Sequence, residues 1–228
     1  MKGIIFNLVE EVVANDHGPD AWDDILAAAG VEGAYTAVGS YSDDELLAIV
    51  SAAATATGAS EDDILRHVGR YSIPPLAQRY PEFFTLHRGL RTFLPSLNSV
   101  IHPEVRKLYP GAQPPHFTIT DDADGGILME YHSQRSMCRL AEGLTLGAAD
   151  HYGEPVTVTH PQCTREGASH CLLRVDLGRP ITNSSRHGHR SPGSNVAWSA
   201  SARPGGSPKR SQKDLCAGCT RGSGLLTC

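Results

Sequence analysis

The chain has 228 residues, of which 40% are hydrophobic and 20% are charged, and these values are typical of a globular domain with a substantial core. Residues 1–178 contain 12 Lys or Arg and 24 Asp or Glu, a net charge of −12, whereas residues 179–228 contain 8 and 1, a net charge of +7. The acidic main part argues against a nucleic-acid-binding protein.

The first hundred residues have mostly helical patterns. Gly18-Pro19 and Gly30 separate the first two predicted helices, and Ser42 followed by Glu45 resembles a capping box at the start of a third. Ser60, three residues before an aspartate, is a weaker signal of the same kind. The predicted helices span about 2–15, 20–29, 42–57, 60–68 and 82–94, and the pair Pro74-Pro75 is expected to interrupt the chain between the last two.

The pattern changes to a strand period after Pro110-Gly111. Residues 123–125 form a predicted hairpin turn, because Ala-Asp-Gly lies between two alternating apolar segments. The predicted strands span about 117–122, 126–133, 155–160 and 171–177, with one helix at about 135–152 between the second and the third. This order predicts an α+β fold, with a helical N-terminal part and an antiparallel sheet of about four strands.

The composition changes again at residue 179. Residues 179–228 are rich in Ser, Gly, Pro and Arg and have few large apolar side chains, so they cannot offset the entropy of ordering by burial. We therefore predict a domain at 1–178 followed by a disordered basic tail. Cys216, Cys219 and Cys228 lie in this tail, and a single C-x-x-C pair without a second one suggests no function.

The N-terminal segment lacks the features of a signal peptide. Lys2 precedes an apolar run, but Glu10 and Glu11 follow before any small-residue cleavage site. The most apolar run, at 46–58, is too short to cross a bilayer. We therefore expect a cytoplasmic protein that does not contact a membrane, in which cysteines act as metal ligands or redox groups rather than as disulfides.

The most informative segment is YHSQR at 131–135. In an extended segment, Tyr131, Ser133 and Arg135 share one face, which offers two hydroxyl groups and a guanidinium. This combination suits a pair of carboxylates. Thirty residues upstream, His102 could bind a metal, and a ligand that has two carboxylates and a histidine-seeking metal is a haem.

Together these two segments resemble the haem–nitric oxide/oxygen binding (H-NOX) family, whose signature is Y-x-S-x-R and a proximal histidine. The family's histidine precedes a Y-P-x-A-x-x-P-like run, and LYPGAQPP follows His102 here. The resemblance covers roughly residues 1–177, including the opening MKGIIFNLVEE. It implies haem b between the helical part and the sheet, His102 as the iron ligand, and Pro115 as the residue that presses on the porphyrin.

Pro103, which directly follows His102, affects where the helix that carries the iron ligand is expected to begin. A residue before proline is disfavoured in the α region, so we expect the proximal helix to begin at Pro103 rather than to include His102.

The resemblance also concerns the choice of gas. Oxygen-binding members of the family place a tyrosine hydroxyl in the distal pocket, and the matching position here is Leu140. An apolar lining from Leu140 with Ile4 or Ile5 favours nitric oxide over oxygen, because bound oxygen becomes negatively charged and needs a hydrogen-bond donor. Carbon monoxide is a further candidate ligand. Family members of this size regulate a separate histidine kinase or cyclic-dinucleotide enzyme, so a partner is implied.

Cysteine and histidine residues form a second candidate metal site. Cys138 lies on the predicted helix, and His160, Cys163 and Cys171 cluster around a loop between two strands. Three thiolates and one imidazole complete a tetrahedral zinc site, and a subset of bacterial H-NOX proteins resembles this pattern. His170 is an alternative to His160, and a set of free, partly buried cysteines is the alternative to zinc.

The leading hypothesis is therefore a haem-based gas sensor without catalytic activity. A haem peroxidase needs a distal acid–base group, which Leu140 does not supply. The main alternative is a haem-free module that zinc holds together and that acts in redox chemistry or binding.

Overall fold

The computed structural model describes residues 1–178, so the predicted tail at 179–228 and its three cysteines lie outside the described residues. The first part is helical, with α1 (Gly3–His17), α2 (Pro19–Ala29), α3 (Asp43–Thr57) and α4 (Glu61–Tyr71). Short helices follow, namely α5 (Ile73–Arg79), α6 (Pro81–Thr85), α7 (Leu90–Ser96), the π-helical turn η1 (Leu97–Ile101) and α8 (His102–Leu108). The remainder contains β1 (His116–Asp121), β2 (Ile127–His132), α9 (Cys138–Tyr152), β3 (Val156–Gln162), the 3-10 turn η2 (Thr164–Glu166) and β4 (Cys171–Leu177).

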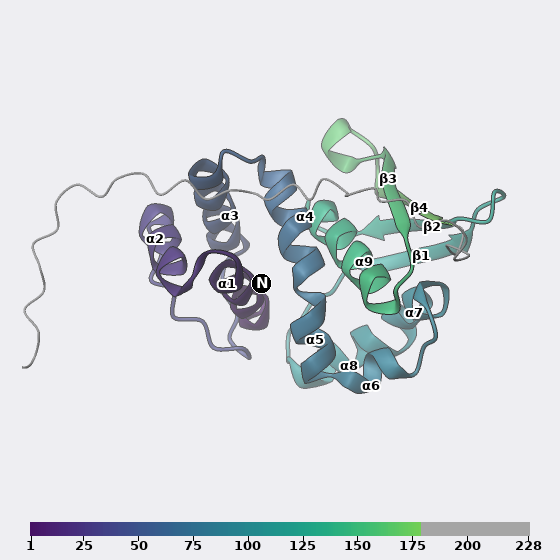
Figure 1. The fold of residues 1–228 in the computed structure, drawn as a ribbon, viewed down its shortest axis with the longest axis horizontal. Helices are drawn as coiled ribbons and strands as arrows, with labels where there is room; N and C mark the ends of the chain where they lie inside the picture. The colour runs from purple at the N-terminus through teal and green to yellow at the C-terminus, as the bar shows by residue number, and fades with distance from the viewer. Residues whose placement is uncertain (179–228) are drawn as a thin grey trace, which may run out of the picture. The chain divides into compact units, whose positions relative to one another are not determined.

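The strands form one four-stranded sheet in the order β1-β2-β4-β3, and all neighbouring pairs are antiparallel (Figure 1). The predicted α+β fold, with a helical N-terminal part and an antiparallel sheet, is confirmed. The turn between β1 and β2 contains Gly125 with φ of 84°, a conformation that glycine adopts at little cost. The hairpin was therefore predictable from local sequence.

The helix starts differ from the prediction in two places. Oγ of Ser42 accepts a hydrogen bond of 3.1 Å from the backbone N–H of Asp44, while Glu45 accepts one from Tyr35. The reciprocal capping box is therefore not formed. Pro74 and Pro75 do not interrupt a helix but lie in the first turn of α5, where their missing N–H groups are not needed.

The predicted helix at 82–94 is two helices, α6 and α7. The backbone N–H of Leu90 at the start of α7 donates a hydrogen bond of 2.9 Å to Glu154, which lies 64 residues further along the chain. This cap comes from tertiary structure, so the local pattern could not indicate the break. At the start of α4, by contrast, Oγ of Ser60 accepts from the N–H of Asp63 at 3.1 Å, as predicted.

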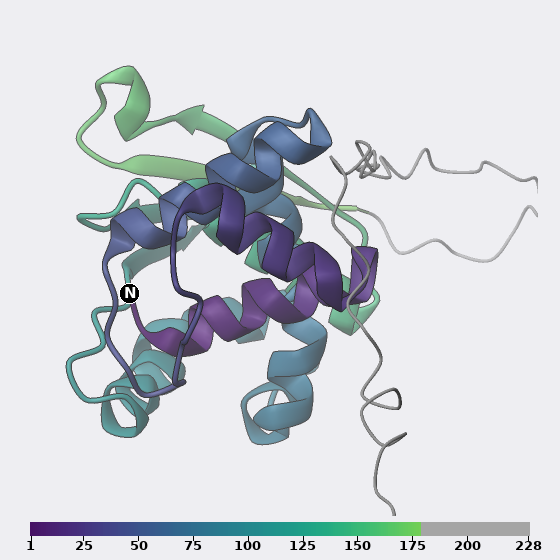
Figure 2. The same ribbon diagram turned by 90° about the vertical axis from the view of Figure 1, so that its left-hand side faces the viewer.

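Two apolar clusters form the core. One consists of side chains from α1 to α4 with Met137, and the other joins the sheet to α5, α7 and α9. Figure 1 shows α1, α2 and α3 grouped together, with α4 and α9 side by side between them and the sheet, and Figure 2 shows the helical group from its own side. The α4–α9 contact is therefore the boundary between the helical part and the sheet part.

Glycines allow α4 and α9 to approach closely. A Cβ atom on Gly143 would lie 2.1 Å from the carbonyl oxygen of Arg66, and one on Gly147 would lie 2.2 Å from that of Arg70. On α4, a Cβ atom on Gly69 would lie 2.4 Å from a carbonyl oxygen of α9. The backbones touch here, so larger side chains cannot be accommodated without separating the helices.

None of the helices in residues 1–178 combines the length and the hydropathy that crossing a membrane requires.

Candidate functional site

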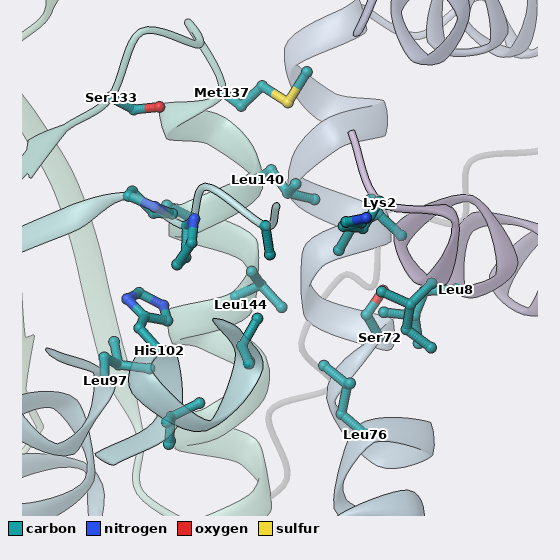
Figure 3. A pocket seen from close by; sticks show the side chains of 18 of the residues that line it. Lys2, Leu8, Ser72, Leu76, Leu97, His102, Ser133, Met137, Leu140 and Leu144 are labelled. Carbon is teal, nitrogen blue, oxygen red and sulfur yellow. The ribbon is translucent and has the colours of Figure 1, made fainter. Parts of the chain in front are cut away.

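A cavity of about 520 Å³ lies among α1, α4, α5, α8, α9 and the first two strands. Its volume is in the range of small-molecule and cofactor sites, about 300–1,000 Å³. In Figure 3, His102 and Leu97 lie on one side of the cavity and Leu8, Ser72 and Leu76 lie on the other. The lining is mostly apolar, so the cavity suits a large flat hydrophobic group with few polar atoms.

His102 is the histidine that lines this cavity. Its Nδ1 atom is buried and has no hydrogen-bond partner. Burial, with a smaller contribution from the nearby Arg106 and His116, lowers the pKa of His102 to about 4, although a hydrogen bond with the backbone of Pro115 acts to raise it. The imidazole is therefore neutral at physiological pH, and this is the form that binds metals.

The expected start of the proximal helix at Pro103 is wrong, because His102 has α-helical angles, with φ of −65° and ψ of −36°, and α8 begins there. The preceding residues form the π-helical turn η1, in which the N–H of His102 donates to the carbonyl group of Leu97, five residues earlier. Because of this wider turn, the chain remains helical through Pro103, although proline lacks an N–H and its ring crowds the preceding turn. Pro103 therefore does not displace His102 from the helix.

Tyr131, Ser133 and Arg135 all line the cavity, but not as three residues of one strand. β2 ends at His132, so Ser133 and Arg135 lie in the turn that leads to α9. Oγ of Ser133 accepts a hydrogen bond of 3.0 Å from the N–H of Arg135, and the Tyr131 hydroxyl donates to the carbonyl group of Arg135 at 3.1 Å. These bonds fold the turn so that all three side chains reach the cavity.

The guanidinium of Arg135 already binds a carboxylate. Its Nε donates to Oδ2 of Asp43 on α3 at 2.7 Å, and another nitrogen donates to the carbonyl oxygen of Gln113 at 3.0 Å. The group is partly exposed at the edge of the cavity, and its chemistry suits the carboxylate groups of a haem.

Several residues of the lining offer no hydrogen-bond donor to a ligand, and the ammonium group of Lys2 already donates to Ser40 and to the carbonyl group of Val38. Leu140, Ile4 and Ile5 are apolar and line the cavity, as does Pro115. Among the hydroxyl groups of the lining, that of Ser72 donates to the carbonyl group of Val68 at 2.7 Å and that of Thr145 to the carbonyl group of Ala141 at 2.9 Å. Both hydroxyl groups therefore already donate to backbone carbonyl groups four residues earlier in the chain, rather than to a ligand in the cavity.

Sequence reasoning missed a pair of tyrosines that also line the cavity. The hydroxyl groups of Tyr80 and Tyr109 lie 2.5 Å apart, and burial together with this hydrogen bond raises the pKa of Tyr109 to about 12. Tyr109 follows α8, so the pair connects the helix that carries His102 to the junction of α5 and α6. Tyr109 belongs to the LYPGAQPP run, but nothing in the sequence identified its partner.

The three cysteines of the second site come together as predicted. The Sγ atoms of Cys138, Cys163 and Cys171 lie within 4.8 Å of one another, and all three residues are buried. Burial and the neighbouring thiols raise the pKa of Cys138 to about 12. Burial also acts to raise the pKa of Cys171, but hydrogen bonds from the hydroxyl and the N–H of Thr164 outweigh it and lower this pKa. Three clustered thiols are a donor set that zinc favours.

The structure does not bring His160 or His170 into this cluster. Nδ1 of His160 contacts Arg139 and lies 3.4 Å from a carboxylate oxygen of Glu142, and its Nε2 atom is buried without a hydrogen-bond partner. His170 contacts Ser169 and Gln162 instead. Within residues 1–178 the cluster therefore consists of three sulfur atoms.

Comparisons with known proteins agree with this geometry. Residues 2–160 match the family model for haem-NO-binding domains. An H-NOX protein from S. oneidensis, solved in the Fe(II)NO ligation state, is 31% identical with a TM-score of 0.74, over 78% of this chain and 100% of that chain. An H-NOX protein from K. algicida, in the Fe(II) unliganded state, is 26% identical with a TM-score of 0.71, over 79% and 98% of the two chains. The chain therefore belongs to the H-NOX family, whose members bind haem and act as sensors rather than as enzymes.

Proposed function

We propose that this chain binds haem b through His102, detects nitric oxide and signals to a separate partner protein. One observation carries the proposal. The half-buried, neutral imidazole of His102, whose Nδ1 atom is fully buried, faces a largely apolar cavity that also receives the three polar side chains of the Y-x-S-x-R segment. An isolated buried histidine nitrogen without a partner is costly in a folded protein, and an iron ligand would satisfy it.

Each cavity residue has a proposed role. His102 would hold the iron, and Tyr131, Ser133 and Arg135 would hold the propionate groups through hydroxyl and guanidinium hydrogen bonds. Pro115 lies in the same lining and would contact the ring. When bound, haem supplies the iron position at which a diatomic gas can coordinate.

The lining supports nitric oxide, with carbon monoxide as a second ligand, rather than oxygen. Leu140 and Ile5 present no hydrogen-bond donor, and the hydroxyls of Ser72 and Thr145 donate within their own helices. Bound oxygen needs such a donor because negative charge accumulates on it. Among the solved H-NOX structures from S. oneidensis, one is in the Fe(II)NO state and another in the Fe(II)CO state, which supports these two gases as ligands.

The partner would be a histidine kinase or a cyclic-dinucleotide enzyme, as in family members of this size. The parts available to move are the α1–α3 group and the sheet part, which meet at α4 and α9. A shift of His102 would act on this boundary through α8 and the cavity wall.

We propose zinc for the cysteine cluster, bound by Cys138, Cys163 and Cys171 with His160 as the fourth ligand. The buried Nε2 atom of His160, which has no partner, supports this assignment, although the imidazole must leave its contacts with Glu142 and Arg139. A haem-free module that zinc holds together is less well supported. That reading would gain support if Pro103 disturbed the proximal ligand, but His102 has helical geometry despite that proline.

The experiment is an absorption spectrum of the ferrous full-length protein and of His102→Gly, with His116→Gly as a nearby histidine control. We expect a five-coordinate ferrous spectrum for the parent and the control. His102→Gly should lack it and should regain it when free imidazole is added. An unchanged spectrum of His102→Gly without imidazole would contradict the proposed ligand, and absence of haem from the folded parent would contradict the sensor itself.

A further inference from the structure

The exposed face of the sheet carries a row of three histidines that the proposed haem and zinc sites do not use. His116 pairs directly with His132 in the β1–β2 register, and Tyr131 pairs with Cys171 in the β2–β4 register, so His132 and His170 are also opposite each other. β1, β2 and β4 are adjacent strands (Figure 1). The three imidazoles therefore lie side by side across three strands.

The burial pattern places this row on the face away from the core. Along β2, residues at 127, 129 and 131 are buried, whereas His132 belongs to the alternate set and is exposed. His116 is exposed beside the buried Phe117, and His170 is partly exposed beside the buried Cys171. These side chains are accessible to ions in solution, and the cysteine cluster is on the opposite side of the same strands.

The imidazoles are close to one another. The ring centroids of His132 and His170 are 5.0 Å apart, and those of His116 and His132 are 6.3 Å apart. Directly opposite residues on antiparallel strands have Cβ atoms about 4.5–5.5 Å apart, so their side chains can reach one point. Zinc binds imidazole nitrogen at about 2.0–2.1 Å. In residues 1–178 only the three cysteines have their ligand atoms gathered within 4.8 Å of one another, so metal binding here requires the exposed histidine rings to rotate.

A neighbouring carboxylate prepares His132 for metal binding. Nε2 of His132 and Oε2 of Glu130 are 3.1 Å apart, so the neutral ring donates its Nε2 proton to the carboxylate and keeps a lone pair on Nδ1. A carboxylate that accepts from the second nitrogen of a ligating histidine fixes the tautomer and makes the ligand more basic. Nε2 of His170 lies 3.4 Å from the amide nitrogen of Gln162, a long contact that a metal could replace.

We infer that His116, His132 and His170 form a surface site for a divalent transition-metal ion, with His132 and His170 as the primary ligands. Imidazole suits zinc, copper and nickel, and three nitrogen ligands from β1, β2 and the residue that precedes β4 leave a coordination position open to solvent. The site connects β1, β2 and β4 beside the turn that contains Ser133 and Arg135. Occupation would therefore stabilise the end of β2 next to the cavity.

The test uses Ni²⁺ as the probe in equilibrium dialysis of the full chain, followed by elemental analysis. His132→Asn and His170→Asn should each weaken the tightest Ni²⁺ binding at least about tenfold, since even loss of a group that supports a metal ligand costs about 10–100-fold. His116→Asn should also weaken it, but less. Ni²⁺ should raise the melting temperature of the parent and not that of His132→Asn, and the two proteins should melt alike without metal.

Two control variants separate this site from others. Cys163→Ser removes a cysteine ligand, and the double variant His187→Asn/His189→Asn removes histidines outside the described residues. Both should keep the tight Ni²⁺ binding of the parent. Tight binding that persists in His132→Asn and His170→Asn, or that disappears in either control, would overturn the inference. The assay requires no haem, so its result is independent of the proposed sensor function.

Discussion

Nε of Arg135 donates a hydrogen bond of 2.7 Å to Oδ2 of Asp43, and this contact ties the last residue of the Y-x-S-x-R segment to α3. Asp43 also pairs with the N-terminal ammonium group of Met1 at 2.7 Å. Asp43→Asn should reduce the free energy of unfolding by up to about 1 kcal/mol, because both pairs are partly exposed. Urea unfolding measures this change, with the exposed neighbour Asp44→Asn as the control. Equal stabilities of the two variants would show that neither pair stabilises the fold.

Asp62 provides a pH-dependent test of the contact between α4 and the sheet part. Burial acts to raise the pKa of Asp62, but the guanidinium groups of Arg165 and Arg139 outweigh it and hold this pKa below its ordinary value of 3.8. A carboxylate with a lowered pKa in the folded state stabilises the protein above the unfolded pKa, and this contribution is lost as the pH falls through the folded pKa.

Asp62→Asn should therefore lower the free energy of unfolding at pH 7 by up to about 1 kcal/mol, and the difference from the parent should shrink below pH 3.8. Urea unfolding between neutral and acidic pH measures it. The exposed Asp23→Asn on α2 is the control and should follow the parent at each pH. A difference that stays constant into acid would mean that the charge of Asp62 is not the cause.

Leu140 tests the basis of gas selection. Leu140→Tyr should give a ferrous protein that forms a stable oxygen complex, since the new hydroxyl supplies a donor at a place in the lining where Leu140 offers none. Leu140→Phe is the matched control, because it adds the same ring without the hydroxyl, and it should not bind oxygen stably. Absorption spectra in air decide between them. Stable oxygen binding by the phenylalanine variant would show that size, and not hydrogen bonding, controls the choice.

The cysteine cluster should hold one zinc ion per chain. Cys163→Ser should lose the zinc, and both this change and chelation of the parent should lower the melting temperature, because the metal binds the folded state. Elemental analysis and thermal unfolding provide the two measurements. Cys219→Ser, outside the described residues, should behave as the parent, and a melting temperature of Cys163→Ser equal to that of the parent would contradict a structural metal.

Local signals predicted much of this fold. The serine at the start of α4 bonds within its own first turn, and the hairpin turn between β1 and β2 uses its own glycine, so neighbouring residues determine both. The cavity residues were expected from the resemblance to the H-NOX family, and His102, Pro115, Leu140 and the Y-x-S-x-R side chains do line one cavity.

Tertiary contacts account for the errors. The break between α6 and α7 depends on Glu154, which caps Leu90 from a distant part of the chain. His160 was expected beside the cysteines, but Glu142 and Arg139 on α9 hold it elsewhere. His102 remains helical before Pro103 because its N–H bonds to the carbonyl group of Leu97 in a π-helical turn. The rule for a residue before proline considers only those two residues, so it could not predict this turn.

The most direct test of the sensor proposal is the absorption spectrum of the purified ferrous protein without oxygen, then with nitric oxide, and then in air. We expect a five-coordinate ferrous haem that binds nitric oxide and does not form a stable oxygen complex. A folded protein that takes up no haem would contradict the account of His102 and the cavity, and a stable oxygen complex would contradict the role of Leu140.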